Sequence, residues 1–366
     1  IAPPPKPEPP RPITIDLDRM ERVADHYEAP RSDGTRARLT LDPDLQREAE
    51  KLLAEARAPR GAIVALAPDG RILALAGRRT TDPKGGSDGA LDWHLATEAW
   101  APAASVFKLV TASALVAGGV DPADKVCFHG GLRSVTESNL HDSPRDSACQ
   151  SLAFGVAHSN NAILGKLAYQ HLAPGTLAEY AHDLFVAPPA ELALGGATFG
   201  ELDLPSAQGL ELAQAAAGFS GSKLSALGGA LLAATFADGG EQPAPYIVAD
   251  AAPSTRRVLP ESIARAVGKM MVATCEVGSA SRSFGRHRAI AVAGKTGTLT
   301  RTDPFYMEHS WFVGYAPVDH PQIIVSVVLG NPENWHLRGQ QAARRLIDRA
   351  VRRAADRGDK VADRAP

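Results

Sequence analysis

The stretch PAASVFKLVTASALVAGG, from Pro102 to Gly119, predicts a buried helix that carries two polar residues at its start. Its positions are mostly apolar, and two glycines end the pattern. Ser105 opens the helix and Lys108 follows three residues later, so the two side chains share one face. Lysine is almost never fully buried without a partner, and this pair therefore needs a chemical explanation.

The composition is that of an ordinary globular protein. The chain has 366 residues, 44% of them hydrophobic, with 33 glycines and 28 prolines, which is enough for a large core and about two domains. The formal charge of −2 argues against a nucleic-acid-binding surface, so we expect no nucleic-acid partner. No apolar run approaches the ~20 residues that span a bilayer, and no secretory signal opens the chain.

Both ends of the chain are polar. The opening IAPPPKPEPPRP predicts an extended, semi-rigid tether, and we interpret residues 1–36 as linker and lead-in. A tether at this place suggests that a membrane anchor precedes it. Residues 356–366 predict a frayed polar tail.

Strand patterns lie on both sides of a mainly helical middle. Residues 61–77, GAIVALAPDGRILALAG, predict a β-hairpin around a Pro-Asp-Gly turn, after an amphipathic helix over 41–56. Three more strands are predicted within 288–330, and a helix over 339–358 follows them. Residues from about 120 to 240 are mainly helical. We therefore predict an α+β fold: an antiparallel sheet flanked by helices, with a helical lobe inserted between its N- and C-terminal strands. A cleft between the two lobes is the expected place of a site.

The three cysteines leave alternatives open. Cys127 and Cys149 lie in one loop-rich stretch and admit a disulfide, which fits an oxidising compartment, or two unpaired thiols. With His129 and His141 they also admit a zinc site, but the spacing matches no familiar zinc pattern, so we expect no metal. Cys275 indicates a buried helix position.

The Ser105–Lys108 pair has the elements of an activated nucleophile. A serine hydroxyl is a weak nucleophile and needs a neighbouring base to take its proton. Burial among apolar residues favours the neutral form of lysine, which general-base catalysis requires. The start of a helix also offers free backbone N–H groups to a developing oxyanion. Alone, the pattern is equally typical of a helix cap followed by a lysine that extends to solvent.

Two further stretches add weight to this interpretation. HSNNAILGK places a serine and two asparagines, residues 159–161, before another apolar helix. AGKTGTLT places a lysine, a glycine and two threonines, residues 295–298, on a predicted strand, where small residues let a peptide lie close to the backbone. Taken singly, each is also explained as a helix cap or a strand end.

Together, and in this order, the three stretches match a known set of motifs. Ser-x-x-Lys, a Ser-Asp-Asn-type element and Lys-Thr-Gly are the signature of penicillin-binding proteins and serine β-lactamases. The chain resembles the transpeptidase domain of the penicillin-binding proteins. Stretches such as LDPDLQREAEKLL, LAQAAAGFSG and HSWFVGYAP resemble the family in the same order. The resemblance extends over about residues 37–350, and we expect the transpeptidase domain to occupy 37–355.

The resemblance implies a role for each catalytic residue. Ser105 would be the acylated nucleophile and Lys108 its base. Ser159 would relay a proton to the leaving amine with the help of Lys295, and Asn161 would hold the acyl amide and contact Lys108. No cofactor is implied.

The resemblance also implies the substrate. Thr296 and Thr298, with Gly297 between them, would bind the terminal carboxylate of a D-Ala-D-Ala stem peptide, and the backbone N–H groups of Ser105 and Thr298 would form the oxyanion hole. A neighbouring stem peptide would be the acceptor, β-lactams would trap Ser105, and membrane proteins of cell-wall synthesis are expected partners. The enzyme would then act outside the cytoplasm, at the periplasmic face of the inner membrane.

Several positions depart from the family pattern. Pro-Ala-Ala precedes Ser105 where many transpeptidases have Pro-Gly, and Ser279 stands where relatives often have threonine. The segment GNPENWHLRGQQAA carries Trp335 and His336 where a plainer connection is expected. The acidic motifs of glycosyltransferases are absent from the sequence, so we do not expect this chain to polymerise glycan.

Other functions share these motifs. A D,D-carboxypeptidase would use water as the acceptor. A β-lactamase would need a glutamate to activate water, and the helical region offers only Glu179 and Glu191 without a clear match. A β-lactam sensor or an inactive cell-wall scaffold is an alternative of another class, although a scaffold is expected to lose a motif residue and none is lost here.

Overall fold

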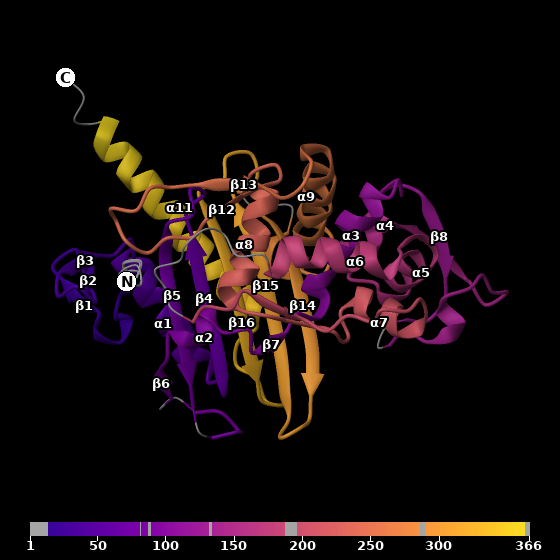
Figure 1. Cartoon of the computed structure of the whole chain (residues 1–366), viewed down its shortest axis with the longest axis horizontal. Helices are drawn as coiled ribbons and strands as arrows, with labels where there is room; N and C mark the ends of the chain where they lie inside the picture. Colours follow the sequence, from indigo (N-terminus) through magenta and orange to yellow (C-terminus); the bar gives the residue numbers. More distant parts are fainter. Residues whose placement is uncertain are drawn as a thin grey trace, which may run out of the picture.

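The central element of the computed structural model is a six-stranded antiparallel sheet (Figure 1). The structure describes residues 14–80, 82–86, 89–131, 134–186, 196–285 and 290–362. The strand order is β14-β15-β16-β4-β5-β6, with β4 at Arg60–Leu66, β5 at Ile72–Arg79, β6 at Ala90–Leu91, β14 at Ala293–Arg301, β15 at Met307–Ala316 and β16 at Ile323–Asn331. Because β16 pairs with β4, the early hairpin and the late strands form one sheet, which confirms the predicted fold class.

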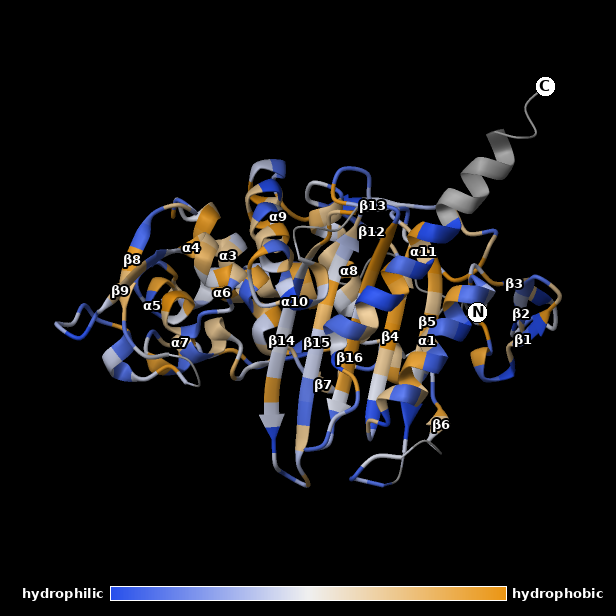
Figure 2. Ribbon diagram, turned by 180° about the vertical axis from the view of Figure 1, so that it is seen from behind, coloured by the Kyte–Doolittle hydropathy of each residue, from blue (hydrophilic) through white to orange (hydrophobic). Residues whose placement is uncertain are grey.

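Helices cover both faces of the sheet. For this reason every residue of β4 after Arg60, the first one, is buried. Ile63 packs with α1 (Pro43–Ala56) and α11 (Gly339–Ala362) on one face, which Figure 2 shows in front of the sheet. Val64 faces the opposite core, together with α8 (Ala226–Ala237). Short helices α2 (His94–Thr97) and α10 (Ser281–Phe284) complete these layers, and α9 (Glu261–Glu276) lies against the edge strand β14.

The helical lobe lies beyond β14, at the end of the sheet away from β6 (Figures 1 and 2). It contains α3 (Lys108–Ala117), α4 (Leu152–Ala157), α5 (Asn161–His171), α6 (Pro174–Ala181), the π-helical turn η4 (His182–Val186) and α7 (Leu210–Ala217). A hairpin of β8 (Lys125–Phe128) and β9 (Ala148–Ser151) borders it. Helix α8 was expected in this lobe but packs on the sheet instead, because it is apolar on all sides and needs cover all round.

Several short elements were not predicted. β7 (Ala101–Pro102), β10 (Gly200–Leu202) and β11 (Ser222–Leu224) form a small sheet, and β12 (Glu241–Pro243) pairs with β13 (Thr255–Arg257). The 3-10 turns are η1 (Leu17–Arg19), η2 (Ala104–Phe107) and η3 (Glu137–Asn139). Strands of two or three residues carry too few side chains to show an alternating pattern.

The N-terminal prediction is wrong for the part of it that the structure describes. Residues 14–38 are not a lead-in: β1 (Glu21–Val23), β2 (His26–Pro30) and β3 (Arg36–Arg38) form a sheet. Its inner side is buried through Tyr27, Ala29 and Ala37, while ion pairs such as Arg36–Glu28 cover its outer side. The Pro-rich stretch 1–13 lies outside the described residues.

The C-terminal boundary also differs from the expectation. Helix α11 continues to Ala362, past the expected domain limit at 355, because its alanines and arginines are strong helix formers. None of the helices in the described ranges is both long and apolar enough to cross a bilayer.

Candidate active site

A tight backbone path presents Ser105 at the junction of the sheet and the helical lobe. The predicted helix starts as the 3-10 turn η2 and becomes α-helical at Lys108. Ala104, directly before the serine, has a φ of 50°, in the left-handed region. The indole N–H of Trp311 on β15 donates to the Pro102 carbonyl at 2.9 Å and fixes the approach to this turn. Ser105 itself remains partly exposed.

Lys108 is the centre of the polar contacts around this serine. Its side chain is 0% exposed, and its Nζ lies 2.7 Å from Ser105 Oγ, 2.7 Å from Asn161 Oδ1 and 2.8 Å from the Ala217 carbonyl. Burial, with a smaller contribution from Lys295, lowers the pKa of Lys108 far below its usual value. A neutral amine has two N–H donors and one lone pair. It can therefore donate to both carbonyl oxygens and accept the hydroxyl proton of Ser105.

A second serine–lysine pair lies beside the first. Ser159 occupies the turn between α4 and α5 with a φ of 58°, and Lys295 Nζ lies 3.0 Å from its Oγ and 2.9 Å from the Thr296 carbonyl. Burial lowers the pKa of Lys295 to about 7. The next residue, Asn160, caps α5 by accepting from the Ile163 N–H at 3.0 Å. The pair can thus exchange a proton near neutral pH.

Strand β14 forms the wall opposite these helices. Thr296 Oγ1 lies 2.6 Å from Ser279 Oγ. Ser279, which stands where relatives often have threonine, therefore still contacts the strand. Gly297 lets β14 pack close to η2: a Cβ there would lie 3.2 Å from Trp311 and 3.3 Å from Val106. Thr298 is exposed. A cavity of about 560 Å³ brings together Ser105, Ser159, Asn161, Thr296 and Thr298.

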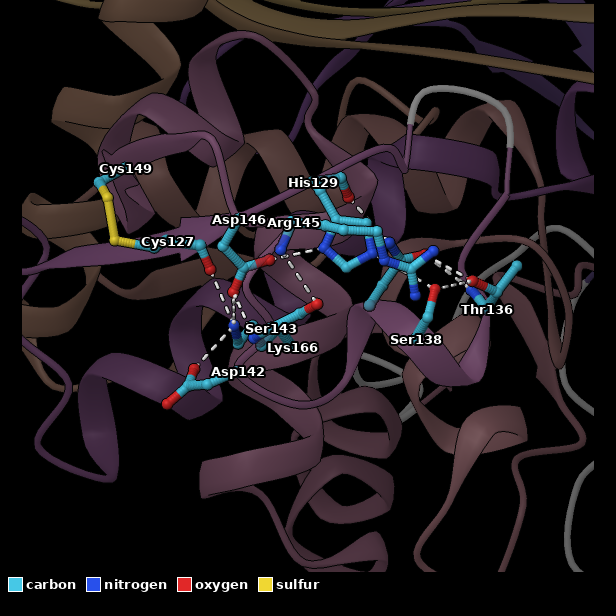
Figure 3. A network of polar contacts seen from close by, with 11 residues as sticks. Cys127, His129, Thr136, Ser138, Asp142, Ser143, Arg145, Asp146, Cys149 and Lys166 are labelled. Carbon is cyan, nitrogen blue, oxygen red and sulfur yellow. Dashed lines mark hydrogen bonds and ion pairs between the residues drawn. A yellow bond between two sulfur atoms is a disulfide. The ribbon is translucent and has the colours of Figure 1, made fainter.

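An ion-pair network holds α5, the helix that begins at Asn161 (Figure 3). Lys166 on α5 is buried and contacts Asp146 at 2.9 Å and the Cys127 carbonyl at 2.8 Å. Asp146 also lies 2.6 Å from His129 Nδ1, and hydrogen bonds from these two partners lower its pKa to about 2. The network therefore ties α5 to the β8–β9 hairpin.

The structure joins Cys127 and Cys149 in a disulfide between directly paired positions of β8 and β9. These sulfurs are therefore not free to act as thiolate ligands. In the part of the chain that the structure describes, no group of three or more potential ligands could hold a metal ion. Cys275 is a buried, unpaired residue of α9, as predicted.

Some residues of the cavity were missed by the sequence analysis. Arg338 and Gln340 line it from the segment that follows β16. Trp335, noted as unusual, lies against the Arg338 guanidinium, whose carbon is 4.3 Å from the ring centre. Arg338 also pairs with Glu308 at 3.4 Å. The odd composition of this segment was the available signal, but only the fold places it at the cleft.

The cavity that holds Ser105 is lined by neutral and basic side chains in the part of the chain that the structure describes. Among the residues that the structure describes, no Asp or Glu lines it. Glu179 is exposed on α6, and Glu191 lies outside the described residues. The arrangement therefore offers two amines, two hydroxyls and an amide, which suits nucleophilic attack on a carbonyl carbon and proton transfer to a leaving amine.

The chain is similar to known proteins in sequence and in fold. A sequence profile described as the penicillin-binding protein transpeptidase domain matches residues 61–350. A probable peptidoglycan D,D-transpeptidase PenA of Neisseria flavescens is 26% identical over 86% of this chain and 82% of its own length. Peptidoglycan D,D-transpeptidase PbpA of Mycobacterium tuberculosis is 26% identical over 95% of this chain and 78% of its own length. The imipenem acyl-enzyme of M. tuberculosis penicillin-binding protein A has the same fold, with a TM-score of 0.68 and 21% identity over 86% of this chain and 79% of that chain.

Proposed function

The chain belongs to the penicillin-binding protein transpeptidase family, and we propose that it is a serine D,D-transpeptidase that cross-links peptidoglycan. The observation that carries this proposal is the position of Lys108 Nζ, 2.7 Å from both Ser105 Oγ and Asn161 Oδ1. Its relatives PenA and PbpA are named as peptidoglycan D,D-transpeptidases.

The geometry of the two serine–lysine pairs supports the following acylation step. Neutral Lys108 takes the hydroxyl proton as Ser105 Oγ attacks the carbonyl carbon of the penultimate D-Ala. The backbone N–H groups of Ser105 and Thr298 stabilise the oxyanion, and Asn161 holds the acyl amide. The C–N bond then breaks, and the terminal D-Ala leaves with a proton relayed from Ser159 and Lys295. The product is an ester on Ser105.

Substrate binding is assigned to β14. The hydroxyls of Thr296 and Thr298 hold the terminal carboxylate, and Gly297 keeps the strand flat between them. The amine of a neighbouring stem peptide attacks the ester carbon, gives up one proton to the Ser159–Lys295 pair and so restores what that pair gave to D-Ala. The ester C–O bond then breaks, the cross-linking amide forms, and Ser105 Oγ regains its proton from Lys108. A β-lactam enters by the same first step and leaves the serine acylated.

The absence of an acidic residue among the described lining residues favours a transpeptidase over a β-lactamase, because nothing there activates water for rapid deacylation. The Cys127–Cys149 disulfide supports action outside the reducing cytoplasm. We propose that the enzyme works there on stem-peptide donors and acceptors, alongside membrane proteins of cell-wall synthesis.

Time-resolved mass spectrometry with benzylpenicillin tests the proposal. We expect a long-lived adduct that peptide mapping places on Ser105, and no adduct on a Ser105→Ala variant with an unchanged melting temperature. Formation of a peptide dimer from a stem-peptide donor and an acceptor amine then separates the transpeptidase from a carboxypeptidase. An adduct that clears within seconds, or folded wild-type protein without an adduct, would contradict the proposal.

A further inference from the structure

Lys166, a buried lysine that the proposed reaction does not use, lies in the same lobe as Lys108. Both side chains are 0% exposed. Lys108 Nζ meets one hydroxyl and two neutral carbonyl oxygens. By contrast, Lys166 Nζ lies 2.9 Å from the carboxylates of both Asp142 and Asp146 (Figure 3). Burial acts to lower the pKa of Lys166, but the hydrogen bonds to the two carboxylates outweigh it and raise the pKa. Lys166 is therefore an ammonium group inside the lobe.

The ion pair of Lys166 with Asp146 has a direction that an apolar contact lacks. Asp146 is 7% exposed, and removing two charges from water costs free energy that their attraction offsets only in part. Apolar side chains of similar volume often replace such pairs without loss of stability, and Leu164 and Leu167 on the same helix are buried in this way. A hydrogen bond weakens steeply when its angle or length changes. The ion pair therefore fixes the rotation and the height of α5.

The atom whose position depends on this rotation is Asn161 Oδ1. Lys166 lies five residues after Asn161 on α5, which places it about 7.5 Å further along the helix axis and about 140° around it. Asn161 contacts Lys108 at 2.7 Å, while Lys166 contacts the Cys127 carbonyl of the β8–β9 hairpin at 2.8 Å. A slide or rotation of α5 would thus move Asn161 Oδ1 relative to the base.

The segment between β8 and β9, which we call the clasp, packs on the first turn of α5. The structure describes the clasp over residues 129–131 and 134–147. A Cβ on Gly131 would lie only 2.3 Å from the Cβ of Ala162, so the two backbones are in close contact. Asp146, near the other end of the clasp, is the partner of Lys166. The ion pair therefore holds the clasp against α5.

The clasp also contacts the helix that carries the second carbonyl around Lys108. Val135 of the clasp packs with Ala213 and Ala217 of α7 in a small apolar cluster. Its carbonyl accepts from the side-chain amide of Gln214, also on α7, at 2.9 Å. Ala217 is the last residue of α7, and its carbonyl accepts from Lys108 Nζ at 2.8 Å. Both carbonyls around the Lys108 amine thus belong to helices that pack against the clasp.

We propose that Lys166 is a positioning residue for the acylation of Ser105. It holds α5 against the clasp, and α5 holds Asn161 Oδ1 at 2.7 Å from Lys108 Nζ. When the two N–H groups of the neutral amine point to their carbonyls, its lone pair points to the Ser105 hydroxyl. A looser α5 lets the amine turn away, and the base is then aligned in fewer molecules. This inference rests on the proposed function, in which Lys108 is the base.

A double variant separates position from stability. Lys166→Met with Asp146→Asn removes the ion pair without leaving a lone buried charge, because the asparagine can still contact His129 and the Ser143 N–H. We expect a melting temperature within about 5 °C of the wild type. The rate of Ser105 acylation at saturating benzylpenicillin, followed by mass spectrometry, should be about 30-fold lower.

An ion pair elsewhere provides the matched control. Arg353 of α11 pairs with Asp42 and Asp44 at the start of α1, on the face of the sheet that α1 and α11 cover. Arg353→Met breaks these contacts and should leave the acylation rate unchanged, whatever its effect on the melting temperature.

A double-mutant cycle shows whether Lys166 acts through Asn161. In an Asn161→Ala background the oxygen that α5 positions is gone, so loss of the ion pair should slow acylation by less than about threefold. Asp146→Asn alone is a milder change that keeps an oxygen for Lys166. It should show the same pattern, with a loss of about fivefold that shrinks in the Asn161→Ala background, and it serves as the test if the double variant does not fold.

The outcomes distinguish this inference from the proposed function. An unchanged rate without the ion pair, an equal fold-loss in the two Asn161 backgrounds, or an equal loss in Arg353→Met would overturn the positioning role. Folded wild-type protein that forms no adduct on Ser105 would instead overturn the proposed function.

Discussion

Replacing Lys295 by methionine should remove a pH-dependent part of the stability. The side chain is 0% exposed and burial lowers its pKa from 10.5 to about 7. An unfolded chain leaves this lysine near its ordinary pKa of ~10.4. Between these two values the unfolded state binds one more proton than the folded state. The free energy of unfolding of the wild type therefore rises with pH across this window, by about 1.4 kcal/mol per pH unit from this lysine.

Denaturant unfolding measures the effect directly. Between about pH 7.5 and about pH 9.5, Lys295→Met should gain about 2.7 kcal/mol less than the wild type, whatever constant offset the substitution adds. Lys108 keeps its own contribution of the same sign, because its pKa is also lowered. Lys51→Met, at a side chain that is 63% exposed, should leave the slope of the wild type unchanged. If the free energy of unfolding of Lys295→Met rises with pH as steeply as that of the wild type, Lys295 is charged in the folded protein. The proposed proton relay would then lose its basis.

Two further substitutions test the support of the site. Gly218→Ala would place a Cβ 2.1 Å from the Ala104 carbonyl oxygen, at a φ of +90°. The resulting shift of the backbone beside the nucleophile should slow penicillin acylation by about 100-fold. Gly175→Ala, whose Cβ would have nothing within 4 Å, should not slow acylation, and equal rates in the two variants would refute the reasoning. Serines at Cys127 and Cys149, which are 22 residues apart, should lower the free energy of unfolding by about 3 kcal/mol, measured by urea denaturation; a loss under ~1 kcal/mol would show that the ion pairs hold the hairpin without the disulfide.

The strands in the middle of the central sheet were predictable because they are buried on both faces. β4 and β16 are continuous apolar runs, and such runs bounded by turn residues indicate core strands. The N-terminal sheet gave no such signal. Its strands have three to five residues and carry charges on the outer side, so their pairing depends on contacts with distant residues, such as the bridge of Leu39 to Val248.

The catalytic side chains were predictable for a different reason. Ser105 and Lys108 are three residues apart, and a helical turn brings such positions together whatever the rest of the fold does. Arg338 could not be found in this way, because it reaches the cavity only through the pairing of β15 with β16 and the docking of the following segment. The left-handed Ala104 was also hidden, since alanine gives no local signal for a positive φ.

The lysine in the apolar helix can now be explained in terms of its partners. An ammonium at the position of Lys108 would lose its hydration, and the contacts with Ser105, Asn161 and Ala217 compensate only in part, so the neutral amine is favoured. The same burial that makes the charged form costly makes the neutral form a base at neutral pH. At pH values below the pKa of free lysine, two such amines lower the free energy of unfolding. Burial of a potentially charged side chain is therefore found at the position where the reaction needs a base. The burial of the large apolar core around α3 offsets the free energy that this costs.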